Sequence, residues 1–332
     1  SLKRLCSKHA NKKVLALNQI VLPSNVISVI CCVQALNIME IRIGDVSLAL
    51  KGAGSERIND PCYSKFITKE GLIPSLRFEF SNKTPKKTYE NRFDSPGLWA
   101  LDFNDIRDFC IEMKGYDRKA IATIQVSFKD KRGFIYLRDN GSALKGSLTK
   151  SLSCLPFCYP VDQVIYINIL PLYKAILLHA CGIKDNGKAY LFSGFSGAGK
   201  TTMAKQWLGL EGVKVLNDDR IIVRELRGVF YAYGTPWHGE LSNCEPERGR
   251  LRALFIIRHG KDNNLRPLSL SEAVSGIITR SFLPFWDKEG MEKAIDVIER
   301  LVRKVPCYEL TFRPDRSVVN YIRSLEDDLF KG

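Results

Sequence analysis

The chain has 332 residues, of which 45% are hydrophobic and 26% are charged, and its formal net charge at pH 7 is +14. This composition is typical of a globular protein with a substantial core, and it excludes collagen-like and low-complexity chains. Basic residues occur near the start of the chain and at Lys83, Lys86 and Lys87, but they are not interleaved with the aromatic residues typical of a nucleic-acid-binding protein. A solvated basic surface is therefore favoured, and a polyanion such as RNA stays as the less favoured partner.

Short strands dominate the first part of the chain. The spacing of Ile106, Phe109 and Cys110 also predicts one helix, over Asp105–Met113, and the polar segment Ser81–Asn91 is predicted to be a loop. The predicted strands are Val26–Val33, Leu76–Phe80, Ala122–Phe128 and Gly133–Leu137.

The polar, glycine-containing segment Ser142–Lys150 is a candidate linker. We therefore predict an N-terminal, mainly β or α+β domain over residues 1–150. No motif in this part carries recognisable chemistry, so we expect it to recognise a substrate or partner. Residues 151–332 are predicted to form a second domain.

The second part alternates strands with longer helices. Its longest apolar stretch, Val164–Ile183, is interrupted by Asn168, Lys174 and His179, which argues against a membrane span and fits a buried helix followed by a strand. The predicted helices are Val161–Tyr173, Lys200–Leu208, Ser271–Thr279, Glu289–Val302 and Asp315–Leu325. The predicted strands are Ile176–Ile183, Lys188–Ser193, Val213–Leu216, Ile221–Arg224, Val229–Tyr233, Leu251–Arg258 and Cys307–Phe312.

Ten cysteines occur without a C-x-x-C pair or a zinc-finger spacing. Because no signal peptide is recognisable, we expect reduced thiols and a cytoplasmic location.

The segment from Gly194 to Thr201, Gly-Phe-Ser-Gly-Ala-Gly-Lys-Thr, matches the phosphate-binding pattern G-x-x-x-x-G-K-[ST]. It lies between a predicted strand and a predicted helix, as the pattern requires, because the helix N-terminus contributes to the anion site. Lys200 is expected to reach the terminal phosphates and the Thr201 hydroxyl to bind Mg²⁺. The expected nucleotide-binding residues are Gly194, Ser196, Gly197, Ala198, Gly199, Lys200, Thr201 and Thr202.

Two adjacent carboxylates, Asp218 and Asp219, follow the predicted strand Val213–Leu216. Phosphoryl transfer needs a metal ion and a group that orients or deprotonates the attacking hydroxyl, and such a pair supplies both. The alternative is an Asx turn that caps the next element.

The order Leu177-Leu-His-Ala180, then the phosphate-binding loop, then Leu216-Asn-Asp-Asp219 resembles the HPr kinase/phosphorylase family and its relatives, including kinases that phosphorylate serine in lasso-peptide precursors. The loop and the paired aspartates also resemble the phosphoenolpyruvate carboxykinases. The resemblance covers about residues 160 to 325. It implies an α/β fold with a carboxykinase-like core built on a mixed sheet.

The resemblance also implies roles. Asp218 would be the base that takes the hydroxyl proton, Asp219 would assist beside the metal, and His179 would lie near the transferring phosphate. Glu240, after a predicted strand, matches an acidic residue near the metal in this group, so Thr201, Asp219 and Glu240 are the expected metal ligands. Among residues outside the motifs, Arg280 is the favoured arginine for the transferring phosphate.

Arg248, Arg250 and Arg252 are alternatives to Arg280, and a solvated surface role is open for each of the four. A lone strand histidine such as His179 is also often a core residue.

The sequence therefore predicts a kinase that uses Mg²⁺ and ATP and phosphorylates a serine-type hydroxyl on a protein, peptide or small molecule. The alternative is a regulatory or RNA-associated module that binds ATP as a switch without transferring phosphate. The oligomeric state, a reverse phosphorylase reaction and the choice between ATP and GTP stay open.

Overall fold

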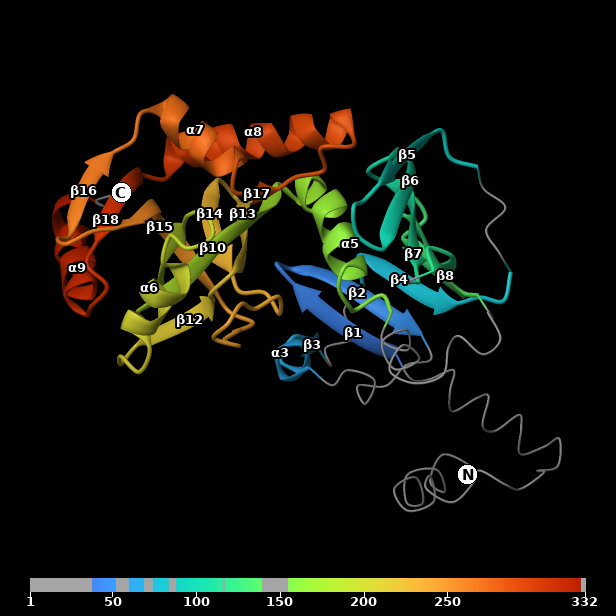
Figure 1. Cartoon of the computed structure of the whole chain (residues 1–332), viewed down its shortest axis with the longest axis horizontal. Helices are drawn as coiled ribbons and strands as arrows, with labels where there is room; N and C mark the ends of the chain where they lie inside the picture. Colours follow the sequence, from blue (N-terminus) through green and yellow to red (C-terminus); the bar gives the residue numbers. More distant parts are fainter. Residues whose placement is uncertain are drawn as a thin grey trace, which may run out of the picture.

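The computed structural model describes residues 38–51, 60–68, 74–83, 88–115, 117–138 and 155–329. It is a mixed α/β structure with two large mixed sheets and few helices. The first sheet is built by residues 38–137 and the second by residues 175–312 (Figure 1).

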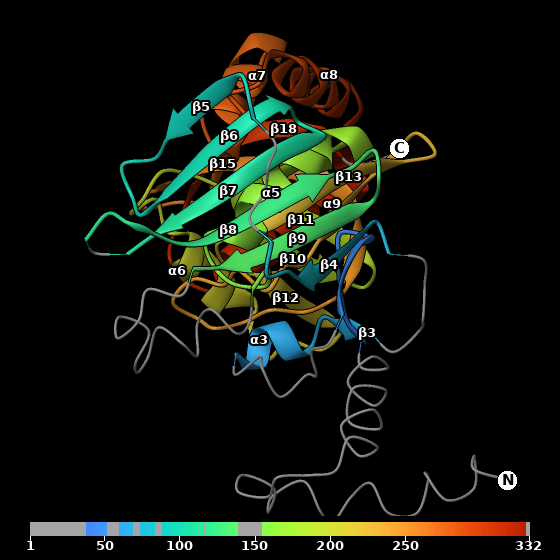
Figure 2. The ribbon, with the colours of Figure 1, turned by 90° about the vertical axis from the view of Figure 1, so that its right-hand side faces the viewer.

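The first sheet has the strand order β3-β1-β2-β4-β9-β8-β7-β6-β5, and Figure 2 shows β5 to β9 side by side. Its strands are β1 (Ile38–Ile43), β2 (Val46–Lys51), β3 (Ile67–Thr68), β4 (Leu76–Phe80), β5 (Asn91–Asp94), β6 (Trp99–Asp105), β7 (Asp108–Lys114), β8 (Ala120–Ser127) and β9 (Arg132–Leu137). The short helix α3 (Pro61–Ser64) precedes β3, and Asp60 caps its first turn.

Helix α5 (Val161–Ile169) continues into the 3₁₀ helix η4 (Leu170–Tyr173) and lies between the two sheets (Figure 1). Its apolar residues belong to the same buried cluster as the core of the first sheet, for example Val164 with Phe109 and Ile124. This cluster extends to Ile222 and Trp237 of the second part, so one apolar core joins both parts of the chain.

The second sheet has the order β11-β10-β13-β14-β15-β18-β16, and β12 and β17 also pair with β10. Strand β11 additionally pairs with β15 in parallel, which closes a circuit through β10, β13 and β14. Its strands are β10 (Ala175–Asp185), β11 (Lys188–Ser193), β12 (Val213–Asn217), β13 (Arg220–Leu226), β14 (Val229–Tyr233), β15 (Arg248–His259), β16 (Asn264–Pro267), β17 (Ser281–Phe282) and β18 (Cys307–Phe312).

Two helix pairs cover this sheet. One buried cluster joins its strands to α7 (Leu270–Ile278) and α8 (Lys288–Lys304), and another joins them to α6 (Lys200–Trp207) and α9 (Ser317–Leu329) (Figure 1). Because successive strand residues face opposite sides of a sheet, Leu191 joins the first cluster and Phe192 the second. No helix among the described residues combines the length and apolarity needed to cross a bilayer.

Most of the predicted elements that fall on described residues are confirmed, and β4, β11, β14 and β18 have the predicted bounds. The predicted helix over Asp105–Met113 is wrong: Ile106 and Arg107 form a turn, and the strand β7 follows. Phe109 and Ile111 are both fully buried, and β7 pairs with β6 and β8 on its two sides. Three apolar residues at helical spacing cannot exclude a strand in which alternate residues are also apolar.

Other predictions fall outside the described residues: the strand Val26–Val33, the linker Ser142–Lys150 and the boundary between residues 150 and 151. The expectation of reduced thiols is wrong for one pair, because Cys62 of α3 and Cys244 form a disulfide. Cys110, Cys181 and Cys307 are free thiols.

Candidate functional site

The predicted phosphate-binding loop connects the end of β11 to the start of α6, as the sequence pattern requires. Gly197 and Gly199 have φ angles of 80° and 98°, a region that side chains disfavour. A Cβ on Gly194 would lie 2.5 Å from the Cβ of Ala198, and one on Gly199 would lie 2.6 Å from a carbon of His259. The loop therefore requires glycine at 197 and 199 for its backbone angles, and at 194 and 199 for its close packing.

Lys200 opens α6 and is 8% exposed. Its ammonium donates hydrogen bonds to the backbone oxygens of Gly194 (3.0 Å) and Phe195 (3.3 Å), so the side chain lies back over the loop. Burial lowers the pKa of Lys200. Both of these partners are backbone carbonyls. Among the described residues, no carboxylate pairs directly with the Lys200 ammonium.

The two aspartates are set in place by Asn217, the last residue of β12, whose side chain is fully buried. Its Oδ1 accepts hydrogen bonds from the backbone N–H groups of Asp219 and Arg220, and its amide donates to the Thr235 carbonyl. The Asx turn that was the alternative to a catalytic pair is thus present, but Asn217 forms it. Both carboxylates are left to make other contacts.

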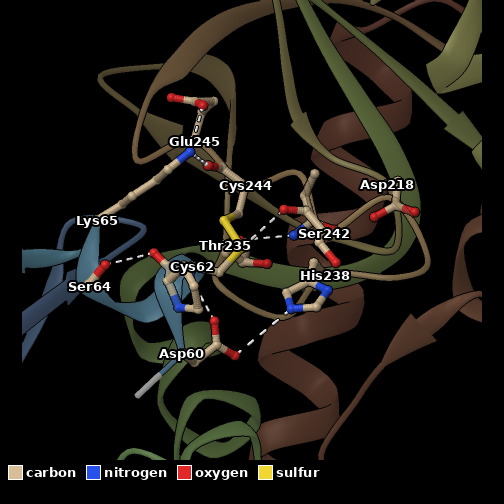
Figure 3. Close-up of a disulfide and its surroundings, with 12 residues drawn as sticks. Asp60, Cys62, Ser64, Lys65, Asp218, Thr235, His238, Ser242, Cys244 and Glu245 are labelled. Atoms are coloured by element: carbon tan, nitrogen blue, oxygen red, sulfur yellow. Dashed lines mark hydrogen bonds and ion pairs between the residues drawn. A yellow bond between two sulfur atoms is a disulfide. The ribbon is translucent and has the colours of Figure 1, made fainter. Parts of the chain in front are cut away.

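Asp218 faces α6 and is 1% exposed. Its Oδ2 lies 3.5 Å from the Thr201 hydroxyl. The backbone N–H groups of Gly239 and Leu241 donate to its two oxygens at 2.8 and 3.1 Å. The segment after β14 therefore curves over Asp218, which lies near His238 and Ser242 of that segment in Figure 3. These contacts hold the carboxylate beside Thr201.

Asp219 points to β10 instead, where its Oδ1 lies 2.9 Å from Nε2 of His179. Its other oxygen forms an ion pair with Arg220 at 3.0 Å. Burial opposes ionisation of Asp219, but the His179 hydrogen bond and the Arg220 charge outweigh it and lower the pKa of this carboxyl. The His179 imidazole is partly exposed, at 30%, and is therefore not a fully enclosed core residue.

Strand pairing explains why His179 reaches Asp219. His179 and Arg220 are register partners in β10 and β13, and the Ala180 N–H donates to the Asp219 carbonyl. The Ser193 hydroxyl at the start of the phosphate-binding loop donates to the His179 carbonyl at 2.8 Å. The histidine, the loop and the aspartates are thus joined through the backbone of β10.

Arg280 also lies at the phosphate-binding loop. Its guanidinium carbon is 4.1 Å from the centre of the Phe195 ring, and its backbone oxygen accepts from the His179 N–H. Burial and the nearby charge of Arg258 lower the pKa of Arg280. Arg280 lies close to another cation and stacks on the loop, so its guanidinium is placed where it could bind an anion.

The alternative arginines lie at the other end of the sheet. Arg250 is the register partner of Lys188, the first residue of β11, whereas the loop begins after Ser193, the partner of Ile256. Arg248 forms an ion pair with Asp45 of the first sheet's hairpin. Arg280 is therefore the arginine, among those predicted, that the fold brings to the loop.

Glu240 lies between the two residues whose N–H groups hold Asp218, but its own side chain is exposed. The fold thus brings Glu240 to the rim of the site rather than into contact with Thr201. The sequence pattern did not point to Arg220, to the stacking of Arg280 on Phe195 or to the backbone donors of Gly239 and Leu241. Only the position of Arg220, directly after the paired aspartates, could have drawn attention to it.

Together, the fold gathers the predicted loop, Lys200, Asp218, Asp219, His179 and Arg280 around the C-terminal end of β11. Neither the protein-family models nor the curated proteins contain a match to this chain.

Proposed function

We propose that this chain is an ATP-dependent kinase that transfers the γ-phosphate to a serine-type hydroxyl of a protein, a peptide or a small molecule. The observation that carries the proposal is the contact between the phosphate-binding loop and the paired aspartates, in which the Thr201 hydroxyl lies 3.5 Å from Asp218. A glycine turn with no ligand would not need a buried lysine at its end and a buried carboxylate from another strand beside it.

The residues of this site fit Mg²⁺ and ATP. No atom lies within 4 Å of the position that a Cβ on Gly197 would take, so a phosphate oxygen can approach the backbone there. The Lys200 ammonium has carbonyl partners that a phosphate oxygen could replace. The Thr201 hydroxyl and the Asp218 carboxylate are oxygen ligands of the kind Mg²⁺ prefers. When bound, the ion would neutralise charge on the phosphates and their transition state.

The geometry favours one change to the roles that the resemblance implies. Asp218 has both oxygens held by backbone donors beside Thr201, so it is suited to hold the metal. Asp219 is more exposed, at 24%, and His179 and Arg220 orient it. We propose that Asp219 is the base that accepts the proton of the attacking hydroxyl. Its lowered pKa keeps it ionised at neutral pH.

Arg280 and Lys200 supply positive charge from two sides of the loop. Arg280 stacks on Phe195, and Lys200 lies within the loop, so both can approach the oxygens of the transferring phosphoryl group. Glu240, at the rim, is assigned to the water shell of the metal rather than to direct binding.

The first experiment titrates ATP with Mg²⁺ into the wild type and into Lys200→Ala, Asp218→Asn and Asp219→Asn, and follows transfer of labelled γ-phosphate to a cell-extract pool. Lys200→Ala is expected to lose both binding and transfer. Asp219→Asn is expected to keep ATP binding and to lose at least about a hundredfold in transfer, the range of general-base catalysis. Asp218→Asn is expected to weaken the Mg²⁺ dependence of binding.

Lys205→Ala is the matched control, since Lys205 is an exposed lysine on the same helix and should leave both signals unchanged. If Asp219→Asn kept near-native transfer and Asp218→Asn lost transfer, Asp218 would be the base and Asp219 would assist beside the metal, as the resemblance implies. Binding of ATP without any labelled acceptor in the wild type would instead support the nucleotide switch, and a polynucleotide affinity that falls steeply with salt would place RNA among its partners.

A further inference from the structure

A cluster of four metal-ligating side chains lies where α3 meets the segment after β14, outside the predicted nucleotide site. Asp60 and Cys62 come from the start of α3, and His238 and Cys244 come from the segment that covers Asp218 (Figure 3). The ligand atoms of Asp60, Cys62 and His238 all lie within 4.8 Å of one another. Cys244 joins them directly, because its sulfur is bonded to that of Cys62.

The orientation of His238 favours metal binding. Its Nδ1 lies 2.9 Å from the Gly239 carbonyl oxygen, so Nδ1 carries the proton and donates it to that oxygen. Nε2 then presents its lone pair, and it lies 3.8 Å from Oδ2 of Asp60. A backbone carbonyl that fixes the tautomer of a histidine is the usual arrangement around a metal-bound imidazole.

Asp60 divides its oxygens in a similar way. Oδ1 accepts the Cys62 N–H at 2.7 Å as the cap of α3, which fixes the carboxylate, and Oδ2 faces His238. Two thiolates, one imidazole and one carboxylate form a four-ligand set of the type that zinc prefers. The structural alternative is a disulfide that happens to lie beside a helix cap and a surface histidine.

We propose that, when Cys62 and Cys244 are reduced, these two thiolates with His238 and Asp60 bind one Zn²⁺. The disulfide and the zinc site are then two exclusive states of the same cross-link. Sulfurs on one tetrahedral zinc lie about 3.8 Å apart, so the metal binds only after the S–S bond has broken. A dithiol reductant supplies two electrons and two protons, becomes a disulfide itself, and leaves two thiols. Zinc binding then releases these two thiol protons.

Other contacts keep the two segments together after the disulfide opens. The Lys65 ammonium donates to the Cys244 carbonyl at 3.0 Å and to the Glu245 carboxylate at 2.9 Å. Trp237 donates to the Tyr63 hydroxyl at 2.9 Å. The four ligands therefore remain near one another in the reduced chain, and the metal would replace a covalent link without a large rearrangement.

The cross-link bears on the predicted nucleotide site through one short segment. His238 directly precedes Gly239, whose N–H holds Asp218, and Cys244 forms a β-bridge with Asn217. Either state of the cross-link therefore ties this segment to α3. The zinc proposal itself needs only the four ligands and goes beyond the kinase proposal.

The test uses the full chain, reduced with a phosphine, desalted without oxygen and titrated with Co²⁺. We expect one Co²⁺ per chain, with the visible bands of tetrahedral cobalt and a sulfur-to-cobalt charge-transfer band, all lost when Zn²⁺ is added. The oxidised chain, identical in sequence, should give none of these bands. His238→Ala and Asp60→Asn should each weaken the affinity at least about tenfold.

Cys307→Ser is the matched control, because Cys307 is a free cysteine on β18, away from this cluster, and its loss should leave the spectrum unchanged. A reduced wild-type chain without stoichiometric cobalt bands would overturn the proposal. Bands that persist unchanged in the double variant of His238 and Asp60 would also overturn it, since the metal would then be held by other groups. Neither readout depends on ATP, so the result is independent of the kinase assay.

Discussion

Asp162 is a fully buried carboxyl at the junction between the two parts of the chain. It accepts hydrogen bonds from Trp237 and from the Gln163 N–H, both at 2.7 Å, and from the Tyr63 hydroxyl. Burial nevertheless dominates and raises its pKa to about 7. The folded chain therefore holds this proton at pH values where the unfolded chain has released it.

The sign of the resulting pH dependence follows from proton linkage. Between its unfolded pKa of about 3.9 and its folded pKa of about 7, Asp162 binds more protons in the folded state, so stability falls as pH rises through this window. Asp162→Asn removes this contribution. We expect the free energy of unfolding of the variant minus that of the wild type to be larger at pH 8 than at pH 5, because only the wild type loses this contribution as the pH rises. Urea unfolding at both pH values measures it, and a pH-independent difference would show that Asp162 does not titrate in this range.

The interface between α8 and β13 depends on one buried carboxylate. Glu225, whose side chain is 7% exposed, forms ion pairs with Arg300 at 2.8 Å and Lys304 at 2.7 Å. Burial alone would raise its pKa, but the hydrogen bonds from both cations lower it. The ion pairs lie at the C-terminal end of α8, where cations are also favoured by the helix dipole.

Glu225→Gln is expected to lower the free energy of unfolding by about 1–2 kcal/mol, since both cationic partners are partly exposed and solvent screens them. Glu292→Gln, on the same helix, removes a carboxylate from a pair with exposures of 91% and 67% and should change stability by less than about 0.5 kcal/mol. Denaturant unfolding of the three proteins gives the comparison. Equal effects of the two substitutions would mean that burial of Glu225 contributes nothing.

The two sheets are connected by polar contacts as well as by a shared core. Arg107 of the first part forms a bidentate pair with Glu289 of α8, the Arg224 guanidinium donates to the Gly44 carbonyl, and the Tyr166 hydroxyl donates to the Val46 carbonyl. Together with the buried cluster that joins Phe109 to Trp237, these contacts predict that the described parts unfold as one unit.

Phe109→Ala tests this cooperativity from the middle of the first sheet. The substitution leaves a cavity and is expected to cost about 3–5 kcal/mol. Trp207 is fully buried against the second sheet, where it stacks on Tyr190. In a background that keeps Trp207 as its one tryptophan, with Trp99, Trp237 and Trp286 replaced by Phe, fluorescence reports on that part while far-ultraviolet circular dichroism reports on the whole chain. Both transitions should shift together. A fluorescence transition that stays in place while the other moves would establish two independent domains, as the sequence analysis predicts.

The sequence by itself determined the local features of this protein. Strands such as Lys188–Ser193 and Cys307–Phe312 follow from short apolar runs between polar or glycine-rich segments, and the loop at Gly194 follows from glycines with fixed spacing. These features depend on interactions between residues close in the chain. The helix predicted at Asp105–Met113 failed for the same reason, because neighbouring strands rather than local spacing decided that segment.

Only the tertiary structure decided what meets across long sequence separations. The register of β10 against β13 places His179 at Asp219, and the curve of the segment after β14 encloses Asp218. Cys62 and Cys244 are 182 residues apart, and no spacing rule connects them to His238 and Asp60. Such contacts result from the packing of two sheets on one core, and a linear pattern carries no information about that packing.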